Sequence, residues 1–143
     1  MEIRFEGPLV YVSLAGEMNG RLAEQTYRKV LRECVAGGYS KMLIDCRALS
    51  GELSTTDRYS LGKVVADENT SVAASEPGRH VRVALVGAHP LVDRDRFGET
   101  VAKNRGAAVK VTCDLESAYR WLGLEPPAAV APDEEPSAIP RLP

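Results

Sequence analysis

A length of 143 residues fits one domain that can bury a hydrophobic core without disulfide or metal support. Hydrophobic residues make up 44% and charged residues 27% of the chain, and its net charge of -2 lacks the electrostatic signature of a nucleic-acid-binding protein. No run of about 18 apolar residues exists that would predict a membrane span. Three widely spaced cysteines and the absence of a secretion signal in the first residues indicate reduced thiols and a cytoplasmic location.

The first third of the chain predicts a hairpin, a helix and a buried strand. Apolar and polar residues alternate over residues 2 to 14 around a break at Gly7-Pro8, as in two paired strands. Over residues 19 to 36 the apolar side chains lie on one helical stripe, with Asn19 as the N-cap and two glycines as the stop. The apolar run at residues 42 to 44 is typical of a strand covered on both faces.

The rest of the chain alternates helices with strands. Ser54 and Asp57 form a capping-box pattern that opens a second helix, and residues 81 to 86 predict a second buried strand. A third helix follows residues 87 to 90 and uses Phe97 and Val101 on its buried side. Residues 109 to 111 predict the last strand, and Asp114 caps a final helix that Gly123 closes.

This order predicts an α/β fold with a single five-stranded, mixed but mostly parallel sheet, an N-terminal hairpin and four helices. We expect residues 1 to 124 to form this domain. Residues 125 to 143 hold six of the nine prolines, together with alanine and acidic residues, and we interpret them as a flexible tail.

Ligands of open parallel sheets bind beyond the carboxyl ends of the strands, which places a candidate site at four predicted loops. These loops are residues 16 to 19, 47 to 53, 87 to 92 and 112 to 114. The sequence contains no Walker-type phosphate loop, no dinucleotide fingerprint, no nucleophile elbow and no paired metal-ligand motif. We therefore expect no cofactor, no metal and no catalytic residue.

Five polar residues near these strand ends are candidates for ligand or partner binding. Asp45 ends a buried strand, where it could bind a cation or accept a proton, or simply pair with Arg47. Ser50 and Ser54 could be phosphorylated, although an N-cap role explains Ser54. His89 precedes a proline at the expected start of a helix and could bind an anion or shuttle a proton, or be an ordinary turn residue.

Two further features have both a functional and a structural interpretation. Cys46 lies next to Arg47, which could lower the thiol pKa and make it reactive, or it is a small residue at the edge of the core. The charged run at residues 93 to 96 is either a partner-binding patch or, more ordinarily, a solvated helix face with cancelling charges.

Three segments resemble the SpoIIAA-like proteins of bacteria, which are related to STAS domains and more distantly to the lipid-binding SEC14 fold. The segments are residues 42 to 47 with 49 to 51, residues 82 to 87, and residues 115 to 122. The resemblance covers residues 2 to 124 and implies a regulatory or ligand-binding domain. Some STAS members carry a phosphorylatable serine just after the third strand, but here Cys46, Arg47 and Ala48 follow Asp45, so that switch residue is not transferred.

Three functions follow from these observations. The first is a non-catalytic regulatory module that binds a protein partner, and the second is a carrier or sensor of a small apolar or lipid-like ligand between helices and sheet. The third is an enzyme that uses Asp45, His89 or Cys46. A carrier requires a closed apolar pocket under the second helix, whereas an enzyme requires two titratable groups that converge in a cleft. We also expect self-association as a homodimer, through a helix face or the first strand.

Overall fold

The computed structural model describes residues 1 to 93 and 95 to 127, in which five strands form one sheet in the order β1-β2-β3-β4-β5. The strands are β1 (Glu2–Glu6), β2 (Leu9–Glu17), β3 (Lys41–Ser50), β4 (Arg82–Val86) and β5 (Val109–Thr112). The first two strands are antiparallel, and β2 to β5 run parallel to one another. The predicted hairpin and mostly parallel sheet are therefore confirmed.

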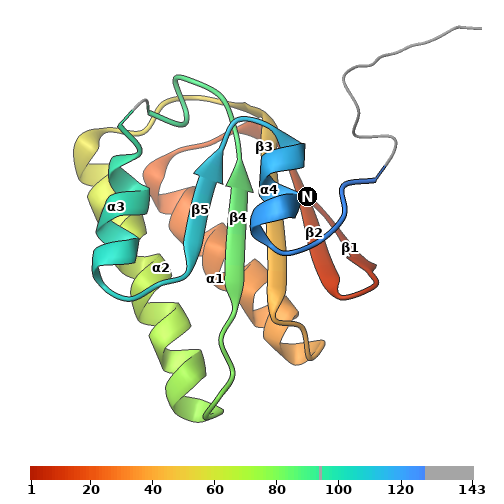
Figure 1. Cartoon of the computed structure of the whole chain (residues 1–143). Coiled ribbons are helices and arrows are strands. Elements are labelled where there is room, and N and C mark those ends of the chain that lie inside the picture. The colour runs from red at the N-terminus through yellow and green to blue at the C-terminus, as the bar shows by residue number, and fades with distance from the viewer. Residues whose placement is uncertain (94, 128–143) are drawn as a thin grey trace, which may run out of the picture.

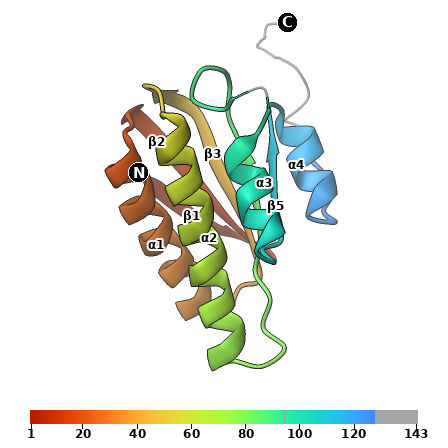
Figure 2. The same ribbon diagram turned by 90° about the vertical axis from the view of Figure 1, so that its left-hand side faces the viewer.

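Four helices cover the two faces of this sheet. They are α1 (Gly20–Ala36), α2 (Thr55–Ser75), α3 (Phe97–Asn104) and α4 (Leu115–Trp121). Figures 1 and 2 show α1, α2 and α3 along one face and α4 alone on the other. None of the helices in the described part of the chain is long and apolar enough to cross a membrane.

The two faces of the sheet have separate hydrophobic cores because side chains alternate along each strand. Val12, Ile44 and Val83 belong to the larger core, under α1 and α2. Leu43 and Ala84 belong to the smaller core, under α4. The central strands are thus apolar on both sides, as their continuous apolar sequence indicated.

The helix starts agree with the sequence analysis. Asn19 accepts a hydrogen bond from the Leu22 amide at the start of α1, and Asp114 accepts one from the Ser117 amide at the start of α4. Ser54 begins α2 with both hydrogen bonds of the capping box. Side-chain oxygens therefore bond amides that have no partner inside each helix.

Two expectations about strand ends and one about a helix start are wrong. β3 continues to Ser50 and β2 to Glu17, so most of the two loops expected at residues 16 to 19 and 47 to 53 is strand. An extra residue in β3 shifts the pairing of the two strands between Asp45 and Ala48, and this bulge conceals the extension in the sequence pattern. The expected helix face at residues 93 to 96 is also wrong, because α3 begins only at Phe97. The tail predicted at residues 125 to 143 lies, from residue 128 onward, outside the described residues.

Candidate functional site

The larger core contains a cavity of about 130 Å³ between the sheet and the helices α1, α2 and α3. From the sheet, its walls include Ile44 and Cys46 of β3, Leu85 of β4 and Val111 of β5. Leu85 and Val111 are only half-buried, although they are direct partners in the β4–β5 pair. The packing of α2 and α3 over the sheet therefore leaves space unfilled.

The lining of this cavity is almost wholly apolar. From the helices it includes Leu61 and Val65 of α2 and Ala102 of α3. Its few polar residues are Thr26, Arg58, Asp93, Arg96 and Glu99. A cavity with so little polar surface holds water poorly, because a buried water needs two to four hydrogen-bonding partners. The cavity is therefore suited to an apolar occupant.

Two glycines determine how closely α2 and α3 approach each other above the cavity. A Cβ atom on Gly62 would lie 2.7 Å from the Gly98 carbonyl oxygen and 2.9 Å from the Cβ of Val101. A Cβ on Gly98 would lie 3.3 Å from the Arg58 carbonyl oxygen. Contacts this short leave no room for a methyl group, so the glycines determine how closely α2 and α3 pack above the cavity.

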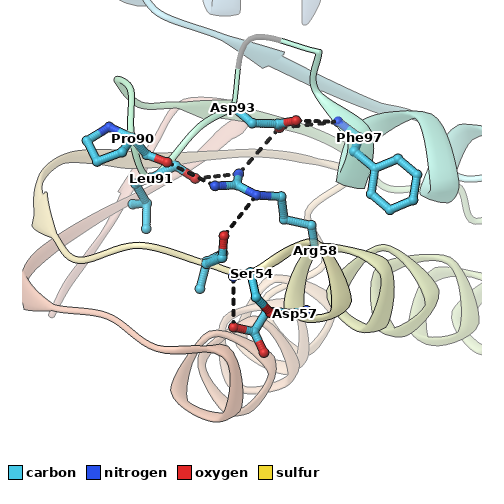
Figure 3. Close-up of polar contacts among 8 residues, drawn as sticks. Ser54, Asp57, Arg58, Pro90, Leu91, Asp93 and Phe97 are labelled. Atoms are coloured by element: carbon cyan, nitrogen blue, oxygen red, sulfur yellow. Dashed lines mark hydrogen bonds and ion pairs between the residues drawn. The ribbon is translucent and has the colours of Figure 1, made fainter.

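Arg58 fastens the chain segment after β4 to the first turn of α2 (Figure 3). Its guanidinium group donates to the carbonyl oxygens of Leu53 at 3.1 Å, Pro90 at 2.9 Å and Leu91 at 2.8 Å. It also lies 3.3 Å from the Asp93 carboxylate, and its side chain is only 12% exposed. The planar fork of an arginine suits this arrangement, because several donors reach separate acceptors at once.

Asp93 connects this arginine to α3. Arg96, the residue before α3, has a left-handed backbone with φ of 49° and makes no side-chain capping bond. The Asp93 carboxylate, from three residues earlier, accepts from the Phe97 amide at 3.2 Å instead. Arg58 and Asp93 together tie the start of α2 to the start of α3 at one edge of the cavity (Figure 3).

Glu99 of α3 connects this helix to the edge strand β5. The outer amides of β5 have no strand partner, since β5 is at the edge of the sheet. The Val111 amide donates to the Glu99 carboxylate at 2.8 Å. This bond holds α3 against the edge strand and protects part of that edge from pairing with another chain.

Asp45 and Arg47 lie on the other face of the sheet, away from the cavity. The Asp45 carboxylate accepts from the Tyr11 hydroxyl at 2.7 Å and from two guanidinium nitrogens of Arg47, each at 2.9 Å. Burial alone would raise the pKa of Asp45, but the bonds from Arg47 and Tyr11 outweigh it and hold that pKa below its ordinary value. The pairing interpretation of Asp45 is confirmed, and the carboxylate stays ionised.

Cys46 is an unreactive core residue. Burial, with a smaller contribution from the neighbouring Asp45 carboxylate, raises the pKa of its thiol to about 12. Of the two interpretations of Cys46, the small core residue is confirmed and the reactive thiol is wrong, because the Arg47 side chain binds Asp45 on the opposite face of the strand. Asp45 and Cys46 point to different faces and so do not converge on one reacting group, as the enzyme hypothesis requires.

The remaining candidate binding residues, Ser50, Ser54 and His89, lie in or after the carboxyl ends of the strands. Ser54 is the N-cap of α2, and Ser50 is the exposed last residue of β3, whose hydroxyl is 3.4 Å from the Gly16 carbonyl oxygen. His89 is exposed, and it does not start a helix, since α3 begins at Phe97. In the described residues no group of three His, Cys, Asp or Glu side chains is arranged to hold a metal ion.

The structure therefore brings together residues that the sequence did not single out. Arg58 has no motif of its own, because three of its four partners are backbone carbonyl oxygens, whose positions no side-chain pattern encodes. The carrier hypothesis requires a closed apolar pocket under the second helix; the cavity lies under α2, but it holds about 130 Å³ and is partly open to solvent. These features define an α/β domain with an apolar cavity between its sheet and three of its helices, in which Asp45 and Cys46 face opposite sides of the sheet.

No protein-family model matches this chain, and no curated protein matches it significantly. Among solved structures, it is similar to an uncharacterised protein of the DUF3478 family from Shewanella loihica PV-4, described as having a SpoIIAA-like fold. The identity is 20%, the TM-score 0.44, and the match covers 85% of this chain and 90% of that chain. It is also similar to the anti-sigma factor antagonist SpoIIAA in its unphosphorylated form, with 16% identity, a TM-score of 0.45, and coverage of 81% and 90%.

Proposed function

We propose that this chain is a regulatory module that senses a small, compact apolar molecule in the cavity between α2, α3 and the sheet. The observation that carries this proposal is the cavity itself, with its volume of about 130 Å³ and almost wholly apolar lining. Of the functions considered from the sequence, the ligand sensor is the one that requires such a pocket under the second helix.

The volume of the cavity limits the size of the ligand. An engineered apolar cavity of about 150 Å³ binds benzene or xenon, so a cavity of this size takes a molecule of about six non-hydrogen atoms. A single unsubstituted ring or a short branched chain fits, whereas a long acyl chain does not. Apolar contact provides the affinity, because the side chains of Arg58, Asp93 and Glu99 at the rim already bond backbone groups of the protein.

A sensor, rather than a passive carrier, follows from what surrounds the cavity. Arg58 and Asp93 line it and also hold the segment from Pro90 to Asp93. A ligand between α2 and α3 contacts both helices that this network joins. Its binding would stabilise the arrangement of their first turns, and a ligand shifts a conformational equilibrium by its difference in affinity for the two states.

The proposal is tested by titrating the purified protein with benzene and measuring urea unfolding. A ligand that binds only the folded state adds about 1.4 kcal/mol to the free energy of unfolding at a free concentration roughly ten times Kd. Val111→Phe places a ring in the cavity and should abolish this gain. Val35→Phe is the matched control, since Val35 of α1 is half-buried against the same core but does not line the cavity.

Methyl NMR spectra of the unmodified protein provide a second readout that does not depend on how the variants fold. Benzene should shift the methyl signals of Leu61, Leu85 and Val111 more than the methyl signals of the smaller core under α4. An absence of both stabilisation and shifts, or equal stabilisation of the two phenylalanine variants, would refute the proposal.

A further inference from the structure

Two stacked aromatic rings, neither of which lines the cavity, lie on the α2–α3 pair. Tyr59 of α2 is 41% exposed, and Phe97 at the start of α3 is half-buried. Their ring centroids are 6.5 Å apart with an angle of 27° between the planes. An exposed tyrosine supported by a second ring is a rigid apolar contact surface with a polar tip.

Two cationic side chains lie beside these rings. The Lys63 ammonium is 5.4 Å from the centroid of the Tyr59 ring, and the Arg105 guanidinium carbon is 5.9 Å from it. Arg105 also donates to the Tyr59 hydroxyl at 3.2 Å. Tyr59, Lys63, Phe97 and Arg105 are called the basic aromatic patch below.

No carboxylate in the described part of the chain forms an ion pair with the cations of this patch. Within the residues that the structure describes, neither Lys63 nor Arg105 has a carboxylate within 4.0 Å, whereas Arg28 on α1 pairs with Glu68 on α2. Nearby carboxylates bond backbone amides instead, as Asp93 and Glu99 do.

We propose that the basic aromatic patch is a docking surface for an acidic segment of a partner protein. Tyrosine and arginine are enriched at the energetic centres of protein interfaces, and opposite charge steers encounter and fixes register. Two carboxylates of the segment would pair with Lys63 and Arg105, and an apolar side chain between them would pack on the rings. A nucleic acid is a poorer fit, because its binding depends on many phosphate contacts and the chain as a whole carries a net charge of -2.

This surface goes beyond the proposed ligand cavity and is independent of it. Leu61 and Gly62 face the cavity, whereas Tyr59 and Lys63 lie further round the same helix. The helix pair that would contact the ligand therefore also carries the partner surface.

The test is an NMR titration of the full chain with a peptide in which one leucine stands between two pairs of glutamates. Amide shifts should concentrate in the first turns of α2 and in α3. The double variant Lys63→Glu with Arg105→Glu should bind roughly tenfold more weakly, because charge reversal replaces attraction by repulsion. Tyr59→Ser, which keeps both cations, should also weaken binding.

The matched control reverses two exposed cations of α1, Lys29→Glu with Arg32→Glu, and changes the net charge by the same amount. The proposal is overturned if this control weakens binding as much as the patch variant, or if no amide shifts at millimolar peptide. It is also overturned if a thymidine oligonucleotide or an anionic lipid vesicle binds the patch more tightly than the peptide. Circular dichroism of each variant verifies that the fold is retained.

Discussion

Replacement of Arg58 by methionine should destabilise the domain far more than an ordinary loss of surface charge. The guanidinium group makes hydrogen bonds to three carbonyl oxygens and an ion pair with Asp93, and its side chain is only 12% exposed. Methionine keeps most of the aliphatic packing but removes every donor. The carbonyl groups and the carboxylate then lose their partners.

The magnitude follows from how enclosed these groups are. A hydrogen bond to a charged group contributes about 1.5 to 3 kcal/mol, and removal of one partner of a buried ion pair costs about 3 to 5 kcal/mol. These costs are not additive, and water can reach the exposed side of the segment. We therefore expect Arg58→Met to lower the free energy of unfolding by about 3 kcal/mol.

Urea unfolding followed by circular dichroism measures this loss, provided that the m-value is unchanged. Arg28→Met is the control, because Arg28 contacts Glu68 at 3.4 Å on an exposed surface, where such pairs contribute less than about 1 kcal/mol. Hydrogen exchange of the Leu91 and Val92 amides should also accelerate in Arg58→Met. The reasoning is refuted if the two variants lose the same stability and the exchange near Leu91 is unchanged.

Three further predictions test other parts of the account. Gly62→Ala should lower the free energy of unfolding, measured in urea, by about 1 to 2 kcal/mol. The cost of overpacking against Gly98 exceeds the roughly 1 kcal/mol by which alanine favours a helix over glycine. A more stable variant would contradict the close contact between the helices. Because the pKa of Asp45 is lowered on folding, its carboxylate stabilises the fold above the unfolded pKa, and this stability is lost as the pH falls through the folded pKa. Asp45→Asn should therefore reduce the dependence of the unfolding free energy on pH below about pH 5. An unchanged slope of free energy against pH would contradict this. Iodoacetamide at neutral pH should modify the exposed Cys113 far faster than Cys46, as mass spectrometry can show; equal rates would disprove the burial of Cys46.

The order and direction of the elements could be predicted because each depends on local sequence. The three apolar runs that predicted adjacent parallel strands pair as β3, β4 and β5, and the caps at Asn19, Ser54 and Asp114 start three helices. These signals are strong because an apolar stretch must be covered and a helix start needs a hydrogen-bond acceptor.

The ends of β2 and β3 could not be predicted in the same way. The bulge between Asp45 and Ala48 interrupts the side-chain alternation, and Arg47 and Ser50 are polar and exposed although they belong to the strand. Pairing between β2 and β3 holds this extension together. Pairing depends on the partner strand, which the local pattern does not contain.

The cavity could not be predicted from the sequence. A cavity is the space left between packed elements, and its size depends on the separation of α2 and α3, which Gly62 and Gly98 set. Nothing in a single glycine indicates which carbonyl it will meet. None of the five predicted site residues lines the cavity, and Asp45 and Arg47 face the opposite side of the sheet.

The most direct measurement of the central claim is a crystal structure of the protein pressurised with xenon. The account predicts one ordered xenon atom in contact with Leu61, Leu85 and Val111, with the glycine contact between α2 and α3 unchanged, since xenon occupies apolar cavities of this size. Side chains that fill this space, or ordered water in place of xenon, would contradict the existence of an apolar ligand site.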